Sequence, residues 1–491
     1  MAVSDSVLIA WLKSGTAKRR ILMEVDAQVG GSETTLYVSD KGYTTSSVEA
    51  PASTNYLAKI SGGISVTESI SLNGDASFSV GEVKFDNKDG SLDAWQNYVF
   101  QGRGIRLYIG DYSWPKVDFY KIFDGVTAKL NVSARDEISL VLSDKLQKLN
   151  TTVSDVKLGG TTNNKDKLIP LLFGECHNIS PLLVDIATLE YQVHNGPINE
   201  ICEVRDNGVP VSFTPYLTTG KFRLSQAPVG TITCTAQGDK PSTYANDAVS
   251  LIKRLVKDYG LAGQRFVDSD LDLTSLSAFA TANTQPLGIY ITDKANVLEV
   301  CQQLATSLGA RVLMTLAGLM RIVKLDLPQA TGGTTVTSVD MEAFSLTPKE
   351  LPPVVAAVKV GYCKNWTVQT ALQTGIPANN IEMFGEEWLT STSIAAATAT
   401  KYKLFSDPNQ EDTLLLTTAT ADAEALRRTN LWSVQRKVMQ YGALQHLILE
   451  QLGNSQTIQH VRHNMSSGVR GQVISKTTDW ATLKITMEVL T

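Results

Sequence analysis

The chain has 491 residues, of which 43% are hydrophobic and 19% are charged, and its formal net charge is −5. This composition is that of a folded globular protein of about three or four domains, and it excludes a disordered chain. The near balance of 44 basic and 49 acidic residues gives no reason to expect general binding to nucleic acid or to an anionic membrane.

The N-terminal segment, residues 1–19, has a short apolar run that is followed, not preceded, by a basic cluster. This is not the layout of a signal peptide, and no stretch approaches the ~18 apolar residues that a membrane span needs. The five cysteines are few, widely spaced and odd in number, which predicts reduced thiols and no disulfide framework or zinc site. We therefore expect synthesis in a cytoplasm, with no unaided secretion and no membrane span.

The first long block, residues 20–150, alternates apolar and polar side chains with a period of two. Ile105, Leu107 and Ile109 are one example, and such alternation predicts half-buried antiparallel strands. Strands that recur this often with short polar turns predict a closed barrel or a sandwich.

After a polar linker at about 151–165, the block 166–240 is again strand-like, and Asp206-Asn207-Gly208 is a hairpin-turn signal within it. The block 241–328 changes character. Its apolar stripes predict two helices, one capped by Asn246 and one by Asp293, followed by a hairpin that turns near Gly318.

The last third, residues 329–491, returns to strands around one embedded helix at 420–437. The predicted fold class is thus mainly β with an α+β insertion, in several domains. The expected order is a first barrel at 20–150, a β domain at 166–240, a small α+β domain at 241–328 and a second barrel at 329–491.

The stretch GEVKFDNKDGSLDAW, residues 81–95, groups carboxylates and amides like a calcium loop. Such a loop needs oxygen ligands at its first, third, fifth and twelfth positions. If Gly90 is the loop glycine, Phe85 falls at the first position and Gln96 at the twelfth. Asn, Asp and Gly are also the residues that turns prefer, so we predict a structural turn at Asn87, Asp89 and Gly90, with no metal.

Other groups of reactive residues fit catalysis poorly. Neither a phosphate-binding loop nor a nucleophile elbow is present, and the adjacent pairs Cys176-His177 and Glu386-Glu387 do not face one site in a strand. His460 and His463 share a face only on a helix, whereas their segment predicts a loop or strand. Arg427-Arg428 and Arg436-Lys437 make the predicted helix basic, which favours a solvated face but leaves open a contact with an acidic partner. We therefore expect a binding or assembly protein, not an enzyme, and no cofactor.

The order of motifs in the first third resembles a module of tail-tip and baseplate proteins of long-tailed bacteriophages. The resemblance begins at RILMEVD, passes LYVSDKGY and KFDNKDGSLDAW, and continues through GRGIRLYIGD and KIFDGV. The stretches IPLLFGECHNISPLLVD and YQVHNGPINEICEVRDNGVPV, and the closing SGVRGQVISKTTDW and LKITMEVL, are similar to hub proteins of those phages and of gene-transfer particles. Together these stretches cover about two thirds of the chain, and they are structural motifs, not catalytic signatures.

The resemblance implies a homotrimeric hub at the distal end of the tail in the virion, with two related barrels per subunit that form a pseudo-sixfold ring on the tail tube. Implied partners are further copies of the chain, the distal tail, tail-tube and tape-measure proteins, and tip or fibre proteins, with phage DNA only in transit. Trp95, Tyr112 and Trp114 lie near turns and are candidate interface anchors, although core packing explains each equally well. A sixfold distal tail ring and a glycan-binding or glycan-degrading β protein are the alternatives.

Overall fold

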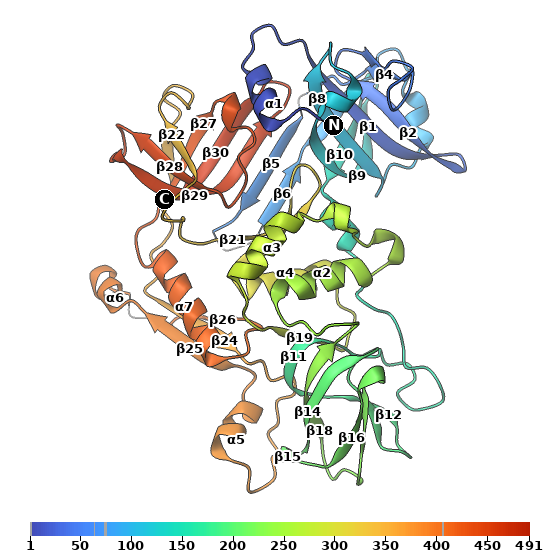
Figure 1. Ribbon diagram of the computed structural model, residues 1–491, viewed down its shortest axis with the longest axis vertical. Coiled ribbons are helices and arrows are strands. Elements are labelled where there is room, and N and C mark those ends of the chain that lie inside the picture. Colours follow the sequence, from blue (N-terminus) through green and yellow to red (C-terminus); the bar gives the residue numbers. More distant parts are fainter. Residues whose placement is uncertain (1, 63, 73–75, 405–406) are drawn as a thin grey trace. The chain divides into compact units, whose positions relative to one another are not determined.

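The computed structural model describes residues 2–62, 64–72, 76–404 and 407–491 (Figure 1). The chain forms two compact units, each built from segments that are distant in sequence. Unit 1 comprises residues 1–148, 313–352 and 435–491, and unit 2 comprises residues 149–312 and 353–434. Strands dominate the described residues and several separate sheets are present, so the predicted mainly β, multidomain fold class is confirmed.

Unit 1 takes its strands from both ends of the chain. They are β1 (Arg19–Val29), β2 (Ser32–Ser39), β3 (Tyr43–Thr44), β4 (Asn55–Ala58), β5 (Ser65–Ile70), β6 (Ala76–Val80), β7 (Glu82–Asp86), β8 (Gly104–Asp111), β9 (Tyr120–Ala134), β10 (Glu137–Ser143), β21 (Met320–Lys324), β22 (Thr334–Thr337), β23 (Thr347–Glu350), β27 (Val438–Ala443), β28 (Ser455–His460), β29 (Met465–Asp479) and β30 (Lys484–Leu490). Its helical elements are α1 (Asp5–Leu12) and the short turns η1 (Asp93–Asn97), η2 (Lys116–Asp118), η3 (Lys145–Leu149) and η7 (Gln445–Leu447).

Two eight-stranded sheets make up most of unit 1. The first has the order β3-β4-β2-β1-β8-β9-β10-β7. The second has the order β22-β28-β29-β30-β27-β23, and β5 and β6 are added to it because β5 pairs with β29 and β6 with β5. In Figure 1 the second sheet accordingly combines red and orange strands with the blue pair β5–β6.

The placement of β5 corrects the sequence interpretation, which assigned this strand to the first barrel. Ser65 to Ser69 pair in antiparallel register with Asp479 to Ser475 of β29. Alternation of apolar residues identifies a strand and its buried face, but it does not say which sheet the strand joins. Here the hairpin β5–β6 does not join the sheet of the strands next to it in sequence. It pairs with β29 and completes the sheet formed by the C-terminal end of the chain.

One hydrophobic core runs through unit 1 and joins the two sheets. It contains Met23 and Leu107 of the first sheet, Val66 of the hairpin β5–β6 and Met487 of the second sheet, all at most 1% exposed. Leu8 and Leu12 of α1 enter the same core, so the N-terminal segment is part of the packed structure.

Unit 2 contains three sheets and most of the helices. Its strands are β11 (Leu171–Ile179), β12 (Leu182–Asp185), β13 (Glu190–Gln192), β14 (Ile198–Asp206), β15 (Val209–Pro210), β16 (Phe213–Tyr216), β17 (Lys221–Leu224), β18 (Ile232–Asp239), β19 (Gly288–Ile291), β24 (Ala357–Tyr362), β25 (Leu389–Ile394) and β26 (Gln410–Asp412), and β20 (Ala310–Met314) lies where the chain passes on into unit 1. Its helical elements are α2 (Ala248–Asp258), α3 (Leu273–Ala282), α4 (Val297–Thr306), α5 (Ala378–Gly385), α6 (Ala396–Tyr402), α7 (Thr418–Trp432), η4 (Leu217–Thr219), η5 (Ala262–Gln264) and η6 (Asp268–Asp270).

The sheets of unit 2 have the orders β15-β14-β18-β11-β19, β12-β13-β17-β16 and β25-β24-β26. The predicted turn at Asn207-Gly208 is present, with φ values of 46° and 87° that a tight two-residue hairpin loop requires. The predicted hairpin near Gly318 is β20–β21, and Gly318 has a φ of 77°.

The three helices that the sequence predicts in this part of the chain, α2, α4 and α7, are present, but their ends differ. Asp247, not Asn246, caps α2 by accepting a hydrogen bond from the Ser250 amide, and Asn296, not Asp293, caps α4. A helix begins at whichever of several neighbouring Asp or Asn residues accepts hydrogen bonds from the first backbone amides. The apolar pattern of the sequence does not specify which one does. Helices α3, α5 and α6 were not predicted.

Helix α7 ends at Trp432, five residues before the predicted end at 437. It packs on β24 and β25 (Figure 1), and residues 353–434, which contain it, belong to unit 2 and not with the C-terminal strands. The predicted domain boundaries do not correspond one to one with these two units, and they stay a prediction.

Candidate functional site

The stretch from Asp86 to Asn97 forms a turn that closes on itself through side-chain hydrogen bonds. Asn87 is buried, its Oδ1 accepts from the Leu92 amide at 2.8 Å, and its Nδ2 donates to Asp93 Oδ1 at 2.8 Å. Gly90 has a φ of 71°, a conformation that favours glycine, and its amide donates to the Asn87 carbonyl oxygen at 2.9 Å. The amides and glycine that suggest an ion ligand in the sequence are thus used by the turn itself.

Asp89 lies on the exposed side of this turn. Both of its carboxylate oxygens accept from Lys59 Nζ, at 2.6 and 2.7 Å, and Oδ1 also accepts from the Ser91 amide and hydroxyl. The hydrogen bond from Lys59 is the main reason why the pKa of Asp89 is lowered. Among the residues that the structure describes, no group of three or more His, Cys, Asp or Glu side chains is arranged to hold a metal ion.

Trp95, one of the three candidate interface anchors, follows directly from this turn through η1. Its ring packs against Phe85 and Phe100 with centroid distances of 5.2 and 5.3 Å, and the side chain is 6% exposed. Core packing, the alternative that the sequence left open, describes this residue. The turn therefore closes one corner of the unit 1 core.

Trp114 and Tyr112, the other two candidate anchors, gather at the end of β8. Trp114 stacks obliquely on Trp11 at 4.8 Å, and Trp11 Nε1 donates to Asp111 Oδ2 at 2.9 Å. Burial would raise the pKa of Asp111, but this hydrogen bond and those from Ser113 lower it to about 2. Tyr112 is 53% exposed, with the Arg20 guanidinium 4.8 Å from its ring centroid. Tyr112 is thus the candidate anchor most open to a neighbour, and its role stays a prediction.

A network of charged and aromatic side chains lies beside these anchors. Glu24 is 8% exposed, and its Oε1 accepts from Tyr56 OH at 2.8 Å and lies 2.9 Å from Lys116 Nζ. Burial would raise the pKa of Glu24, but Lys116, Tyr56 and Arg106 outweigh it, so the pKa is lowered. All of these groups belong to unit 1, and together they stabilise the charged form of the Glu24 carboxylate.

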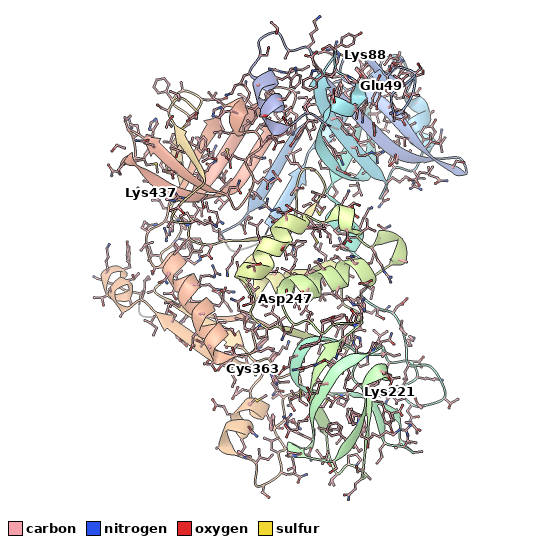
Figure 2. All side chains as sticks on the ribbon, in the orientation of Figure 1. Glu49, Lys88, Lys221, Asp247, Cys363 and Lys437 are labelled. Atoms are coloured by element: carbon pink, nitrogen blue, oxygen red, sulfur yellow. The ribbon has the colours of Figure 1, made fainter. Side chains whose placement is uncertain are left out.

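The arginines of α7 do not form a basic patch for an acidic partner. Arg428 is 9% exposed, and its Nε donates to Glu424 Oε1 at 2.7 Å, while Arg427 donates to both oxygens of Glu424. Both arginines are therefore used within unit 2. Arg436 and Lys437, which the sequence placed on the same helix, lie beyond its end, and Figure 2 labels Lys437.

The remaining reactive residues occupy structural positions. Cys176 is 1% exposed, and burial raises the pKa of its thiol well above the ordinary value, which disfavours the nucleophilic thiolate. His460 ends β28, and its Nδ1 accepts from the Arg462 amide in the hairpin turn that also contains His463. Four of the five cysteines are buried, and Cys202 is exposed.

The sequence did not indicate Phe344, which has the most exposed large apolar side chain among the residues of unit 1 whose side chains the structure describes. Phe344 lies at the tip of the loop between β22 and β23, with a φ of 60° that is uncommon for a bulky residue. Met341 and Leu346 are buried on either side of it, and Ser345 Oγ donates to the Glu342 carbonyl oxygen at 2.7 Å. The loop is therefore clamped in a shape that holds the aromatic ring in solvent, where a binding partner could bury it.

Comparisons with known proteins add the following. No protein-family model matches the chain, and no curated protein matches it. Among solved structures, a tail protein from Neisseria meningitidis MC58 aligns over 96% of both chains with 9% identity and a TM-score of 0.40. The 43 kDa tail protein of prophage MuSo2 from Shewanella oneidensis aligns over 95% of this chain and 98% of its own, with 10% identity and a TM-score of 0.38.

A third structure, described as the virion of a native gene transfer agent particle, aligns over 70% of this chain and 91% of its own chain, with 12% identity and a TM-score of 0.40. A likeness this distant assigns no role to any residue of the present chain. No helix among the described residues is long and apolar enough to cross a membrane.

Proposed function

We propose that the chain is a structural component of a bacteriophage virion, the central hub at the distal end of the tail. In this role three copies form a ring that adapts the sixfold tail tube to threefold tip proteins and closes the tube before DNA ejection. The hub would be synthesised in the host cytoplasm and would assemble with the distal tail, tail-tube and tape-measure proteins. Its role is assembly, without a catalytic step. Two of the structures compared above are tail proteins and the third is part of a gene transfer agent virion, but the proposal rests on this chain's own architecture.

The single observation that carries the proposal is the construction of unit 1. Two eight-stranded sheets from opposite ends of the chain share one core, and the hairpin β5–β6 links them. Three copies of such a unit would present six sheets around one axis, which suits a junction between sixfold and threefold parts. A ring of single-sheet subunits would need six chains, so the paired sheets favour the trimer over the alternative sixfold distal ring.

The surface of unit 1 supports a role in assembly. Phe344 is fully exposed, Val339 on the same loop is 77% exposed, and Leu351, directly after β23, is 60% exposed. Exposed apolar side chains on a clamped loop suit contact with another subunit, where aromatic anchors supply much of the binding energy. The segment ends in β23, which is an edge strand of its sheet and has unpaired backbone groups on one side.

A direct test combines location and interface. Mass spectrometry of purified particles should detect the protein, and mass photometry of the isolated chain should show trimers. Phe344→Ser is expected to shift the population to monomers without lowering the melting temperature, whereas Val48→Ser, a matched change at a side chain that is 92% exposed, leaves the trimer intact. Absence of the protein from particles, or hydrolysis of a cell-wall polysaccharide by the pure protein, would contradict the proposal.

A further inference from the structure

Unit 2 contains a cavity of about 890 Å³ that is separate from the features discussed above. Its wall is formed by the end of β19, one side of α4, the loop after β24, and the segments before β25 and after β26. Cys363, labelled in Figure 2, marks the end of β24, immediately before the loop residues that line the cavity. This volume lies within the range of ~300–1,000 Å³ that small-molecule sites occupy in proteins.

Two tryptophans in this wall face one lysine. Lys364 Nζ lies 4.5 Å from the ring centroid of Trp366 and 5.0 Å from that of Trp388. Both indoles are only half-buried, and the ring of Trp366 also meets Tyr290 edge-on at 6.2 Å. The ammonium group therefore lies over one face of each indole, and the cavity combines two large, half-exposed aromatic side chains with a charged group, an arrangement that the packing of a core does not require.

A buried asparagine holds both tryptophan-bearing segments in place. Asn365 is 2% exposed, and its Nδ2 donates to two carbonyl oxygens shortly before Trp388, that of Phe384 at 2.8 Å and that of Glu386 at 3.0 Å. Its Oδ1 accepts from Asn178 Nδ2 at 2.9 Å, and its own neighbours in the chain are Lys364 and Trp366. Hydrogen bonds of this kind fix the indoles before a ligand arrives, which lowers the entropic cost of binding.

The charges around the cavity narrow the class of ligand. Three acidic and three basic side chains line it, namely Asp293, Glu299, Asp412, Lys294, Arg311 and Lys364. A polyanion such as nucleic acid would meet as many repulsive as attractive charges, and so would a cationic peptide. A neutral ligand with many hydroxyl groups can instead hydrogen-bond to both kinds of charge.

From these observations we propose that the cavity binds a short, uncharged oligosaccharide. The C–H faces of a sugar ring are apolar and stack on indole rings, while the hydroxyl groups at the ring edge need charged or polar partners. Trp366 and Trp388 supply the stacking surfaces, and the charged groups around them supply the hydrogen bonds. Asn365 is a positioning residue. This inference does not depend on the proposed role in the tail.

The test uses the full chain and three defined probes, cellotetraose, maltotetraose and chitotetraose. Each is titrated to about 5 mM in an isothermal titration calorimeter, because weak sites of this kind have dissociation constants of ~1 mM. At least one probe is expected to bind. Trp388→Ala should weaken that binding about tenfold, which corresponds to the loss of one stacking contact. Trp388→Phe should retain most of it. Trp432→Ala, a change at a half-buried tryptophan of the same unit outside the cavity wall, should leave the affinity unchanged.

Trp366 also packs on the hydrophobic core around Leu172 and Phe222, to which Trp388 does not belong, so Trp388 is the decisive position if Trp366→Ala fails to fold. Asn365→Ala should weaken binding while both indoles remain, which distinguishes positioning from direct contact. Absence of binding by all three probes, an affinity unaffected by Trp388→Ala, or preferential binding of a short polyphosphate would overturn the proposal.

Discussion

The buried ion pair between Lys476 and Glu68 provides a sharp test of how unit 1 is held together. Lys476 on β29 is 3% exposed, and its Nζ donates to the carbonyl oxygens of Ile448 at 3.1 Å and Glu450 at 2.6 Å. The same nitrogen lies 3.4 Å from Glu68 Oε2 on β5. The ion pair therefore connects the hairpin β5–β6 to the C-terminal strands of the same sheet.

Replacing Lys476 by Met keeps the length of the side chain and removes its charge. Glu68 is 8% exposed, so its carboxylate would remain in the interior without the ammonium group. Removing one partner of a buried ion pair lowers the free energy of unfolding by about 3–5 kcal/mol. This figure includes the hydrogen bonds that the carbonyl oxygens of Ile448 and Glu450 lose. For a unit of this size each kcal/mol lowers the melting temperature by ~2–4 °C, so Lys476→Met should lower it by about 6–20 °C.

Differential scanning calorimetry of the full chain measures this shift as the movement of one unfolding transition. Lys88→Met is the matched control, because the Lys88 side chain is 76% exposed and its removal should leave the melting temperature unchanged. The double variant Glu68→Leu, Lys476→Met removes both charges and should recover at least half of the loss. A single Lys476→Met variant that melts within about 1 °C of the parent would refute the placement of β5 on β29.

Three further predictions concern the first sheet. Asn87→Ala should lower the free energy of unfolding by about 1–3 kcal/mol, because it leaves the buried Leu92 amide without its acceptor, and a loss below about 0.5 kcal/mol in a denaturant titration would contradict this. Calcium should leave the melting temperature unchanged, and a calcium-dependent rise that is abolished in Asp89→Asn would show that the turn holds an ion after all. Because the pKa of Glu24 is lowered, its stabilising effect is complete above the unfolded value of about 4.3 and is lost as the pH falls through the lower folded value. Glu24→Gln should therefore melt with a shallower pH dependence than the parent between about pH 6 and 3, and equal slopes would exclude this role.

Local signals in the sequence predict the local structure well. The turn at Asn207-Gly208 and the hairpin at Gly318 follow from residues that favour positive φ, and helices α2 and α4 of the middle region follow from their apolar stripes. The alternating strands of the first and last thirds are equally visible, so the mainly β class is predictable without a structure.

Properties that depend on distant contacts are not predictable in this way. The pairing of β5 with β29 joins residues about 410 positions apart, and nothing in the alternation of Val66 and Ile70 identifies that partner. The cap of α4 is Asn296 and not the predicted Asp293, because several neighbouring residues have side chains that can cap a helix. The clamp around Asn365 and the exposed ring of Phe344 also escaped prediction, because burial and exposure arise only once the loops are folded.

The measurement that tests the central proposal most directly is the symmetry of this chain at the tip of an intact tail, determined by electron cryomicroscopy of purified particles. We predict three copies around the tail axis, with the two sheets of each unit 1 alternating to form a pseudo-sixfold ring. Six identical copies with one unit 1 each around the ring, or the absence of the chain from the tail tip, would contradict it.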